Sequence, residues 1–173
     1  MDAPSAPRPH RVLIQPSYGN PISRRNWAST LAAPVPLDRV ADAVTPAALD
    51  ALRRAHPDGA ARFSGLAATH ARTYTQLAPG DVVVMTGQKA VRGIGEIGVL
   101  FDAAGFSGAL WENQRGGCDF PLGYSLRAFR ETEVPYEVIW ALPGFSAGDM
   151  FMGARLLDAG KAAQLLGALP PAA

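Results

Sequence analysis

Short unbroken apolar runs predict the strands of this chain. The clearest is the run from Val82 to Met85, whose β-branched residues follow the turn formers Pro79 and Gly80 and are typical of a buried central strand. A similar run ends at Pro16, and a long Gly-rich apolar segment returns after a turn at 88–89. The predicted strands are 11–15, 82–86, 91–101, 124–129 and about 134–139.

Apolar residues at three- and four-residue spacing predict the helices. The best start is at Thr45, which can cap a helix, followed by Pro46, which is favoured at the first helical position. Leu49, Leu52 and Ala55 would then share its buried face. The predicted helices are 23–31 with Ser23 as its cap, 46–55, 66–74 in an otherwise ambiguous stretch, and 159–169, packing through Ala163, Leu166 and Leu169.

The order of these elements predicts the fold class. A strand, then helices, then a run of strands indicates an α+β protein with a mixed or barrel-like sheet, because regular βαβ units would alternate. A length of 173 residues is that of one domain. We expect that domain at 11–169, between a Pro-rich tail at 1–10 and a frayed end at 170–173.

Composition narrows the function classes. Apolar residues make up 48% of the chain and charged residues 18%, so it can bury a core and does not have the composition of a disordered protein. A net charge of +1 argues against strongly basic nucleic-acid binders, although a local basic patch remains open. The single Cys118 excludes an internal disulfide or a Cys-cluster zinc site, so we expect no metal and no cofactor. No signal peptide or membrane span is visible, and we expect a cytoplasmic protein that does not bind membranes.

The segment 93–98 matches the dinucleotide-binding pattern G-x-G-x-x-G literally. That site needs a strand before the glycines and a helix after them. Here the glycines alternate with Ile94, Ile97 and Val99, which favour a strand over a helix. We therefore predict a bent barrel strand, in which glycine permits coiling or a close approach.

Two tryptophans occupy segments close to predicted strand ends. Trp27 follows the polar loop 15–20, and Trp111 follows the predicted hairpin. Each indole could simply cover one end of the core, as buried tryptophans commonly do. Alternatively, the two rings could form a cage around a planar ligand such as a flipped base, with polar groups of the loop beneath it.

Several cations lie in or beside the same loops and could contact phosphates. Local acidic neighbours could balance two of them: Glu96 follows Arg92, and Arg115 lies between Glu112 and Asp119. The other cations have no such neighbour, so the predicted patch rests mainly on them. They are Arg24, Arg25 and Lys89.

The order of short motifs resembles that of YTH and EVE domains, which belong to the PUA-like superfamily. The opening strand 11–18 with the segment 26–31, the hairpin formed by 80–85 and 93–99, and the later segments 124–129, 133–136 and 153–157 carry the resemblance. It implies a PUA-like mixed barrel flanked by helices. It also implies a non-enzymatic reader that flips a methylated or hydroxymethylated base into an aromatic cage.

The resemblance also assigns residues and partners. It implies Trp27 and Trp111 as the cage rings, with Trp140 in reserve. The expected base-binding residues are Gln15, Ser17, Tyr18, Asn20, Trp27, Ala28 and Trp111, and the expected phosphate-binding residues are Arg24, Arg25, Lys89, Arg92 and Arg115. The implied partner is nucleic acid with a modified base, DNA rather than RNA, as in bacterial restriction systems and phage defence where a separate nuclease subunit cuts.

Two other functions stay open from the sequence. One is an enzyme of the ASCH type acting on RNA or a modified nucleoside, for which Lys89, Glu96 and Tyr124 form the only plausible set. The other is a module that binds a protein or a small metabolite. Salt-dependent binding of nucleic acid would argue against this second alternative.

Overall fold

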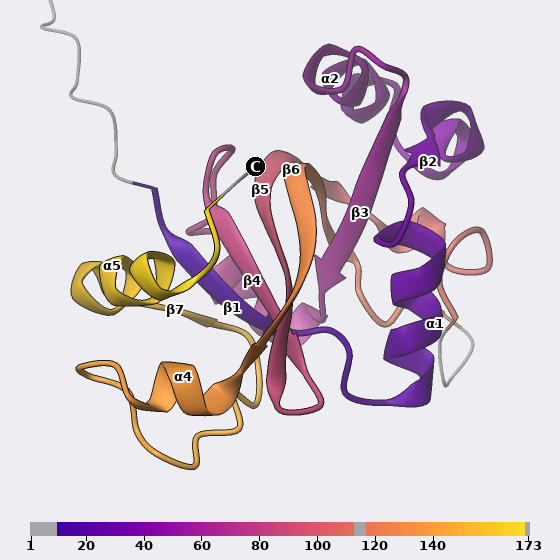
Figure 1. The fold of residues 1–173 in the computed structure, drawn as a ribbon. Coiled ribbons are helices and arrows are strands. Elements are labelled where there is room, and N and C mark those ends of the chain that lie inside the picture. Colours follow the sequence, from indigo (N-terminus) through magenta and orange to yellow (C-terminus); the bar gives the residue numbers. More distant parts are fainter. Residues whose placement is uncertain (1–9, 113–116, 172–173) are drawn as a thin grey trace, which may run out of the picture.

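A seven-stranded mixed sheet forms the centre of the molecule, with the strand order β2-β3-β6-β5-β4-β1-β7 (Figure 1). The computed structural model describes residues 10–112 and 117–171. Within them, β1 and β4 pair in parallel and the other strand pairs are antiparallel. The strands are β1 Val12–Pro16, β2 Val35–Pro36, β3 Ala60–Leu66, β4 Val82–Gly87, β5 Ala90–Asp102, β6 Leu122–Pro135 and β7 Arg155–Leu156.

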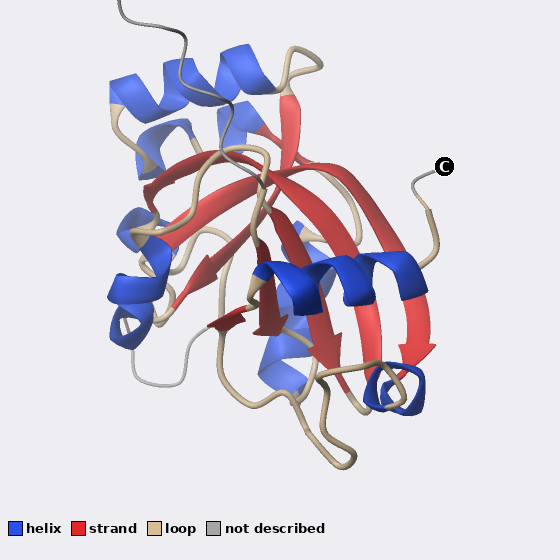
Figure 2. Cartoon of the chain, turned by 90° about the vertical axis from the view of Figure 1, so that its left-hand side faces the viewer, coloured by secondary structure: helices blue, strands red, loops and turns tan. Residues whose placement is uncertain are grey.

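The sheet curves so that β1 and β3 approach each other. Three strands separate them in the sheet order, yet the Gln15 side-chain amide on β1 donates to the Gly65 carbonyl on β3 at 2.8 Å. The pairing register shifts at several points along β5, as at β-bulges. Bulges of this kind bend a strand and increase its local twist, which accompanies the curvature of the sheet. Figure 2 shows the strands bending across the molecule, with α5 lying over one face. The prediction of a strand for the glycine segment 93–98 is confirmed, since it lies inside β5.

Five α-helices accompany the sheet in the described part of the chain. Asn20 caps α1 instead of the predicted Ser23, whose backbone N–H donates to the Asn20 Oδ1 atom at 2.8 Å. Thr45 caps α2 as predicted. The helices are α1 Pro21–Thr30, α2 Pro46–Ala55, α3 Ala71–Tyr74, α4 Tyr136–Trp140 and α5 Ala159–Ala168, with short 3-10 helices at Leu37–Arg39, Ala41–Ala43, Ala68–His70 and Ala104–Phe106.

The sequence missed one strand, and two of its predictions about local structure were only partly right. The strand β3 lies in the stretch that the sequence left ambiguous, and the helix expected at 66–74 is present as a 3-10 helix at Ala68–His70 followed by α3. The strand expected at 134–139 is instead the end of β6 followed by α4, because Pro135 ends the strand and its fixed φ suits a helix start. In the last helix, Leu169 is buried as predicted, whereas Ala162 and Leu165 are buried in place of the predicted Ala163 and Leu166.

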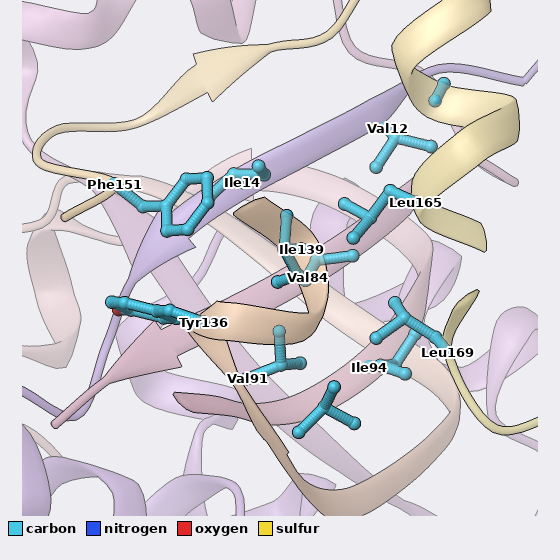
Figure 3. Packing of buried hydrophobic residues seen from close by; sticks show 12 residues of the cluster. Val12, Ile14, Val84, Val91, Ile94, Tyr136, Ile139, Phe151, Leu165 and Leu169 are labelled. Carbon is cyan, nitrogen blue, oxygen red and sulfur yellow. The ribbon is translucent and has the colours of Figure 1, made fainter. Parts of the chain in front are cut away.

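Three apolar clusters form the core. In the first, α4 and α5 pack over β1, β4 and β5 through residues such as Ile14, Ile139 and Leu165 (Figure 3). The second gathers around Phe63 and includes Trp111, and the third gathers around Leu13 and Met85 and includes Trp27. The two tryptophans therefore belong to different clusters.

No helix within 10–112 and 117–171 is long and apolar enough to cross a membrane. No group of three or more His, Cys, Asp or Glu side chains in these same ranges is placed to hold a metal ion.

Candidate functional site

A pocket lies between α1, the end of β1 and β3. It holds about 390 Å³ of empty space, including space open to solvent. Exposed or half-buried side chains form its rim, and buried ones form its walls and floor. Its lining residues are Gln15, Pro16, Ser17, Ser23, Asn26, Trp27, Thr30, Leu31, Ser64, Gly65, Trp111 and Phe120.

Trp27 forms one wall of the pocket from the inner face of α1. It is only 6% exposed. Its indole N–H donates to the carboxylate of Glu131 at 2.9 Å, and its ring meets Tyr18 edge-on at 5.2 Å and Phe129 at 5.8 Å between centroids. These contacts on several sides fix the orientation of the ring.

Trp111 lines the same pocket from the segment that follows β5. Its indole N–H donates to the Thr30 hydroxyl at 3.3 Å, and its ring packs against Phe106 and Phe120 at 5.1 and 6.2 Å between centroids. The sequence offered two interpretations of these tryptophans, as covers of the core and as the rings of a ligand cage, and each describes part of the arrangement. Each indole is buried in a core cluster, and both border one pocket between the clusters.

The floor is polar and uncharged. The Gln15 amide N–H group donates to the Gly65 carbonyl at 2.8 Å and to the Ser64 hydroxyl at 3.3 Å, and its carbonyl accepts from the Tyr124 hydroxyl. Burial raises the pKa of Tyr124 above its ordinary value, which keeps that hydroxyl protonated as a donor. None of the described residues that line the pocket is ionisable at neutral pH. The arrangement suits a neutral planar ring whose edge forms hydrogen bonds.

Hydrogen bonds between α1 and the segment 110–112 hold the two walls together. The Asn26 amide donates to the Glu112 carbonyl at 3.0 Å, and the Glu112 backbone N–H donates to the Asn26 Oδ1 atom at 2.8 Å. The Ser29 hydroxyl donates to the Leu110 carbonyl at 3.0 Å. The distance between the two indoles is therefore set by polar contacts as well as by packing.

Four of the predicted base-binding residues line the pocket and three do not. Gln15, Ser17, Trp27 and Trp111 are brought together. The others lie outside the lining: Tyr18 packs on Trp27, Asn20 caps α1, and Ala28 is exposed on the same helix. The reserve residue Trp140 is partly buried and packs against the first core cluster, and its indole N–H donates to the Asp149 carbonyl.

Cations surround the loop 17–20 beside the pocket. Arg24 donates to the Gly19 carbonyl at 3.4 Å. Arg92 lies over the Tyr18 ring at 5.2 Å and donates to two carbonyls of the turn that carries the exposed Lys89. Within the described chain, neither Arg24 nor Lys89 has an acidic partner.

Two of the expected charge relationships were wrong. Arg25 is not unpartnered, because both of its hydrogen bonds at 2.5 and 2.9 Å go to the Glu112 carboxylate, 87 residues away in the sequence. This contact lowers the pKa of Glu112. Arg92 pairs with Glu133 at 3.3 Å, since Glu96 pairs with Arg127 instead. The predicted phosphate residue Arg115 lies outside the described residues.

The chain is similar to the solved N-terminal domain of McrB from Thermococcus gammatolerans bound to m5C DNA, with a TM-score of 0.66 over 91% of this chain and 96% of that chain, at 14% identity. No protein-family model and no curated protein matches the chain. The chain has the fold of the McrB N-terminal domain. The predicted α+β class, with a mixed sheet flanked by helices, is thereby confirmed.

On this McrB-like fold, the three residues expected for the alternative enzyme do not lie together. Lys89 lies at the turn between β4 and β5, Glu96 lies midway along β5, and Tyr124 pairs with Leu100 further along. A strand rises about 3.3 Å per residue, so the ends of this set are on the order of 30 Å apart along β5. Tyr124 is also fully buried beneath Gln15.

The sequence did not predict several lining residues. Ser23, Asn26 and Thr30 recur at helical spacing with Trp27, a signal that could have placed them on one face of α1. Ser64 and Gly65 gave no such signal, because β3 was not expected.

Proposed function

We propose that this chain recognises a modified base in DNA, such as 5-methylcytosine, by holding the flipped base in the pocket between Trp27 and Trp111. One observation carries the proposal: two indoles from distant segments border one pocket with a polar, uncharged floor. The fold supports it, because the similar McrB domain was solved bound to m5C DNA. The extrusion of the base is part of the proposal.

In such a complex, the free energy gained by stacking the base is similar in size to the free energy that its extrusion costs. Stacking a base on an aromatic ring contributes ~1–3 kcal/mol. Extrusion from the duplex costs a few kcal/mol. One methyl group in a fitted pocket changes binding by ~1–3 kcal/mol. The methyl group of the base and the fit of the indoles can therefore determine whether extrusion is favourable.

Each residue then has a role. Trp27 and Trp111 contact the faces of the base, and the hydroxyls of Ser17 and Ser64 hydrogen-bond to its edge, while Gln15 holds the floor in place. Tyr18 braces Trp27, and Asn20 fixes the start of α1, so these two act through their neighbours. Ala28 has no contact role in this proposal, because it lies on the exposed side of the helix.

The DNA backbone would pass over the loop 17–20. Arg24 and Lys89 lie around this loop without an acidic partner in the described chain, and phosphates prefer such local donors. Arg25 and Arg92 would contribute less, because Glu112 and Glu133 already offset their charges. The chain acts as a binder in this proposal, and cutting of the recognised DNA falls to a separate nuclease subunit.

A pocket-filling variant tests the proposal. Trp27→Ala would empty a buried site at a cost of ~3–5 kcal/mol, so loss of binding would not be informative. Ser23→Leu instead fills the pocket from its rim and leaves the backbone N–H of the capping bond in place. Ala28→Leu adds the same side chain to the exposed face of the same helix and is the matched control.

The measurement is the ratio of affinities for duplexes with 5-methylcytosine and with cytosine at one position. We expect a clear preference in the wild type and in Ala28→Leu, and its loss in Ser23→Leu. Equal affinities of the wild type for both duplexes, or an unchanged preference in Ser23→Leu, would overturn the proposal. Matched RNA strands in the same panel would show whether RNA is preferred.

A further inference from the structure

Three side chains at the floor of the pocket form a closed ring of hydrogen bonds. The Gln15 amide N–H donates to the Ser64 hydroxyl at 3.3 Å, and the Tyr124 hydroxyl donates to the Gln15 amide oxygen. A hydrogen bond between the hydroxyls of Ser64 and Tyr124 completes the ring. All three residues are buried, at 9% exposed or less, and Gln15 and Ser64 line the pocket while Tyr124 lies beneath them.

The direction of each hydrogen bond in this ring is fixed. The Gly65 carbonyl can only accept, and it takes the second N–H of the Gln15 amide at 2.8 Å, so the amide oxygen must face Tyr124. Burial raises the pKa of Tyr124, so its hydroxyl keeps the proton that it gives to Gln15. The bond between the two hydroxyls therefore uses the proton of Ser64.

The floor consequently offers a ligand lone pairs and no side-chain proton. Both N–H groups of the Gln15 amide and the Ser64 proton are used inside the floor. The Gln15 amide oxygen and the Ser64 oxygen each accept one hydrogen bond there and can accept another. A ligand that brings a donor gains a hydrogen bond, whereas a ligand that brings an acceptor leaves buried polar atoms unpaired.

The walls add no proton to this floor from their indoles. The indole N–H of Trp27 donates to Glu131, and that of Trp111 donates to the Thr30 hydroxyl. The Thr30 hydroxyl in turn donates to the Asn26 carbonyl at 2.9 Å. Both indoles therefore present ring surface to the pocket.

The rim carries the other polar side chains of the lining. The Ser17 hydroxyl donates to the Gln15 backbone carbonyl at 3.2 Å, which leaves its oxygen free to accept. Ser23 and Asn26 also carry donor groups, but both are half-buried and belong to the rim. The buried end of the pocket is thus the part that has a defined polarity.

We propose that this floor selects a base with an exocyclic amino group, so that the pocket binds 5-methylcytosine in preference to thymine. The inference rests on the proposed function and names what the pocket reads besides the methyl group. Thymine carries a 5-methyl group as well, but it has a carbonyl acceptor where cytosine has an amino donor. The amino group would donate to Gln15 and Ser64, whereas the thymine carbonyl would add a further acceptor to theirs.

Four bases at one position test the two features separately. 5-Methylcytosine and cytosine have the amino group, thymine and uracil have the carbonyl, and the first member of each pair has the methyl group. Each base is placed opposite an abasic site in otherwise identical duplexes, so that no base pair has to break. We expect each amino base to bind about 10- to 100-fold more tightly than the carbonyl base of the same methylation, as for one or two lost hydrogen bonds.

Tyr124→Phe tests the ring itself, with Tyr124 as a positioning residue. The variant removes one oxygen that does not line the pocket, and it frees the Ser64 proton to donate to a base. The affinity ratio of 5-methylcytosine to thymine should then fall by about fivefold, as for one hydrogen bond. Tyr74→Phe is the matched control, because its hydroxyl donates to the Phe101 and Gly123 carbonyls, and it should keep the wild-type ratio.

The panel distinguishes a failure of this inference from a failure of the proposed function. Equal affinities of the wild type for 5-methylcytosine and thymine would overturn the inference, while a preference for 5-methylcytosine over cytosine would leave the proposed function in place. An amino preference without a methyl preference would refute the reading of the modification and retain the selective floor. A wild-type ratio in a folded Tyr124→Phe variant would overturn the ring as the cause of selection.

Discussion

Asn26 and Glu112 are joined by two hydrogen bonds, one in each direction, between the Asn26 side chain and the Glu112 backbone. This pair connects α1, which carries Trp27, to the segment that carries Trp111. The separation of the two pocket walls thus depends on a polar contact between residues 86 positions apart in the sequence.

Asn26→Ala should loosen this connection. Two hydrogen bonds of about 1 kcal/mol each would be lost, so we expect the free energy of unfolding to fall by ~1–2 kcal/mol. Affinity for methylated DNA should also fall, because the Trp111 wall is no longer held. Denaturant unfolding and a binding titration measure the two effects. Glu112→Gln keeps both backbone bonds and should change stability little, so a similar loss in that variant would contradict the account.

Gly93 should not tolerate a side chain. A Cβ atom there would lie 2.8 Å from ring carbons of both Trp27 and Phe129. Gly93→Ala should therefore destabilise the fold by ~1–3 kcal/mol and displace the Trp27 wall. Gly19→Ala is the control, because its Cβ would meet nothing within 4 Å. Equal melting temperatures for the two variants would contradict the packing described.

The cations around the loop 17–20 should act on all DNA sequences alike. Removing one phosphate contact reduces the slope of log K against log[salt] by about one. We expect this for Arg24→Ala and for Lys89→Ala, and a smaller change for Arg25→Ala, because Glu112 balances that charge. Affinities measured across a salt series give the slopes. A loss confined to methylated DNA would show that these residues contact the base region instead.

Buried His56 should make stability depend on pH. Its Nε2 atom lies 2.7 Å from the Ser125 hydroxyl, and burial, aided by Arg127, lowers its pKa. The unfolded chain then binds a proton below about pH 6.5 that the folded chain does not yet bind. Neutral His56 therefore makes its full contribution to the free energy of unfolding above that pH. This contribution is lost as the pH falls toward the lowered pKa of the folded state. Unfolding measured from pH 7 to pH 5 should show this decline, and His56→Gln should have a shallower slope.

Local patterns predicted much of the fold and four of the twelve residues that line the pocket. The cap and proline at the start of α2, the apolar runs of β1 and β4, and the glycines of β5 act through neighbours in sequence, so they could be recognised. β3 could not, because Ser64, Gly65 and the small residues around them become a strand only by pairing with β6. The same applies to Arg25 and Glu112, whose ion pair depends on the tertiary fold.

Helix positions explain which of the expected base-binding residues line the pocket. Trp27 was identified by its aromatic ring, but its place on an inner helix face also put Ser23 and Thr30 into the lining and left Ala28 in solvent. That result follows from helical spacing, because Ser23 lies four residues before Trp27 and Thr30 lies three residues after it.

The methyl group of the target base provides the most direct test of the central claim, that the base lies between the indoles of Trp27 and Trp111. A duplex with a ¹³C-labelled 5-methylcytosine methyl group would be observed by NMR, free and bound to the protein. We predict a large upfield ring-current shift of the methyl proton on binding to wild type and to Ala28→Leu, and none with Ser23→Leu. A bound methyl signal that keeps its duplex position with wild-type protein would contradict the account.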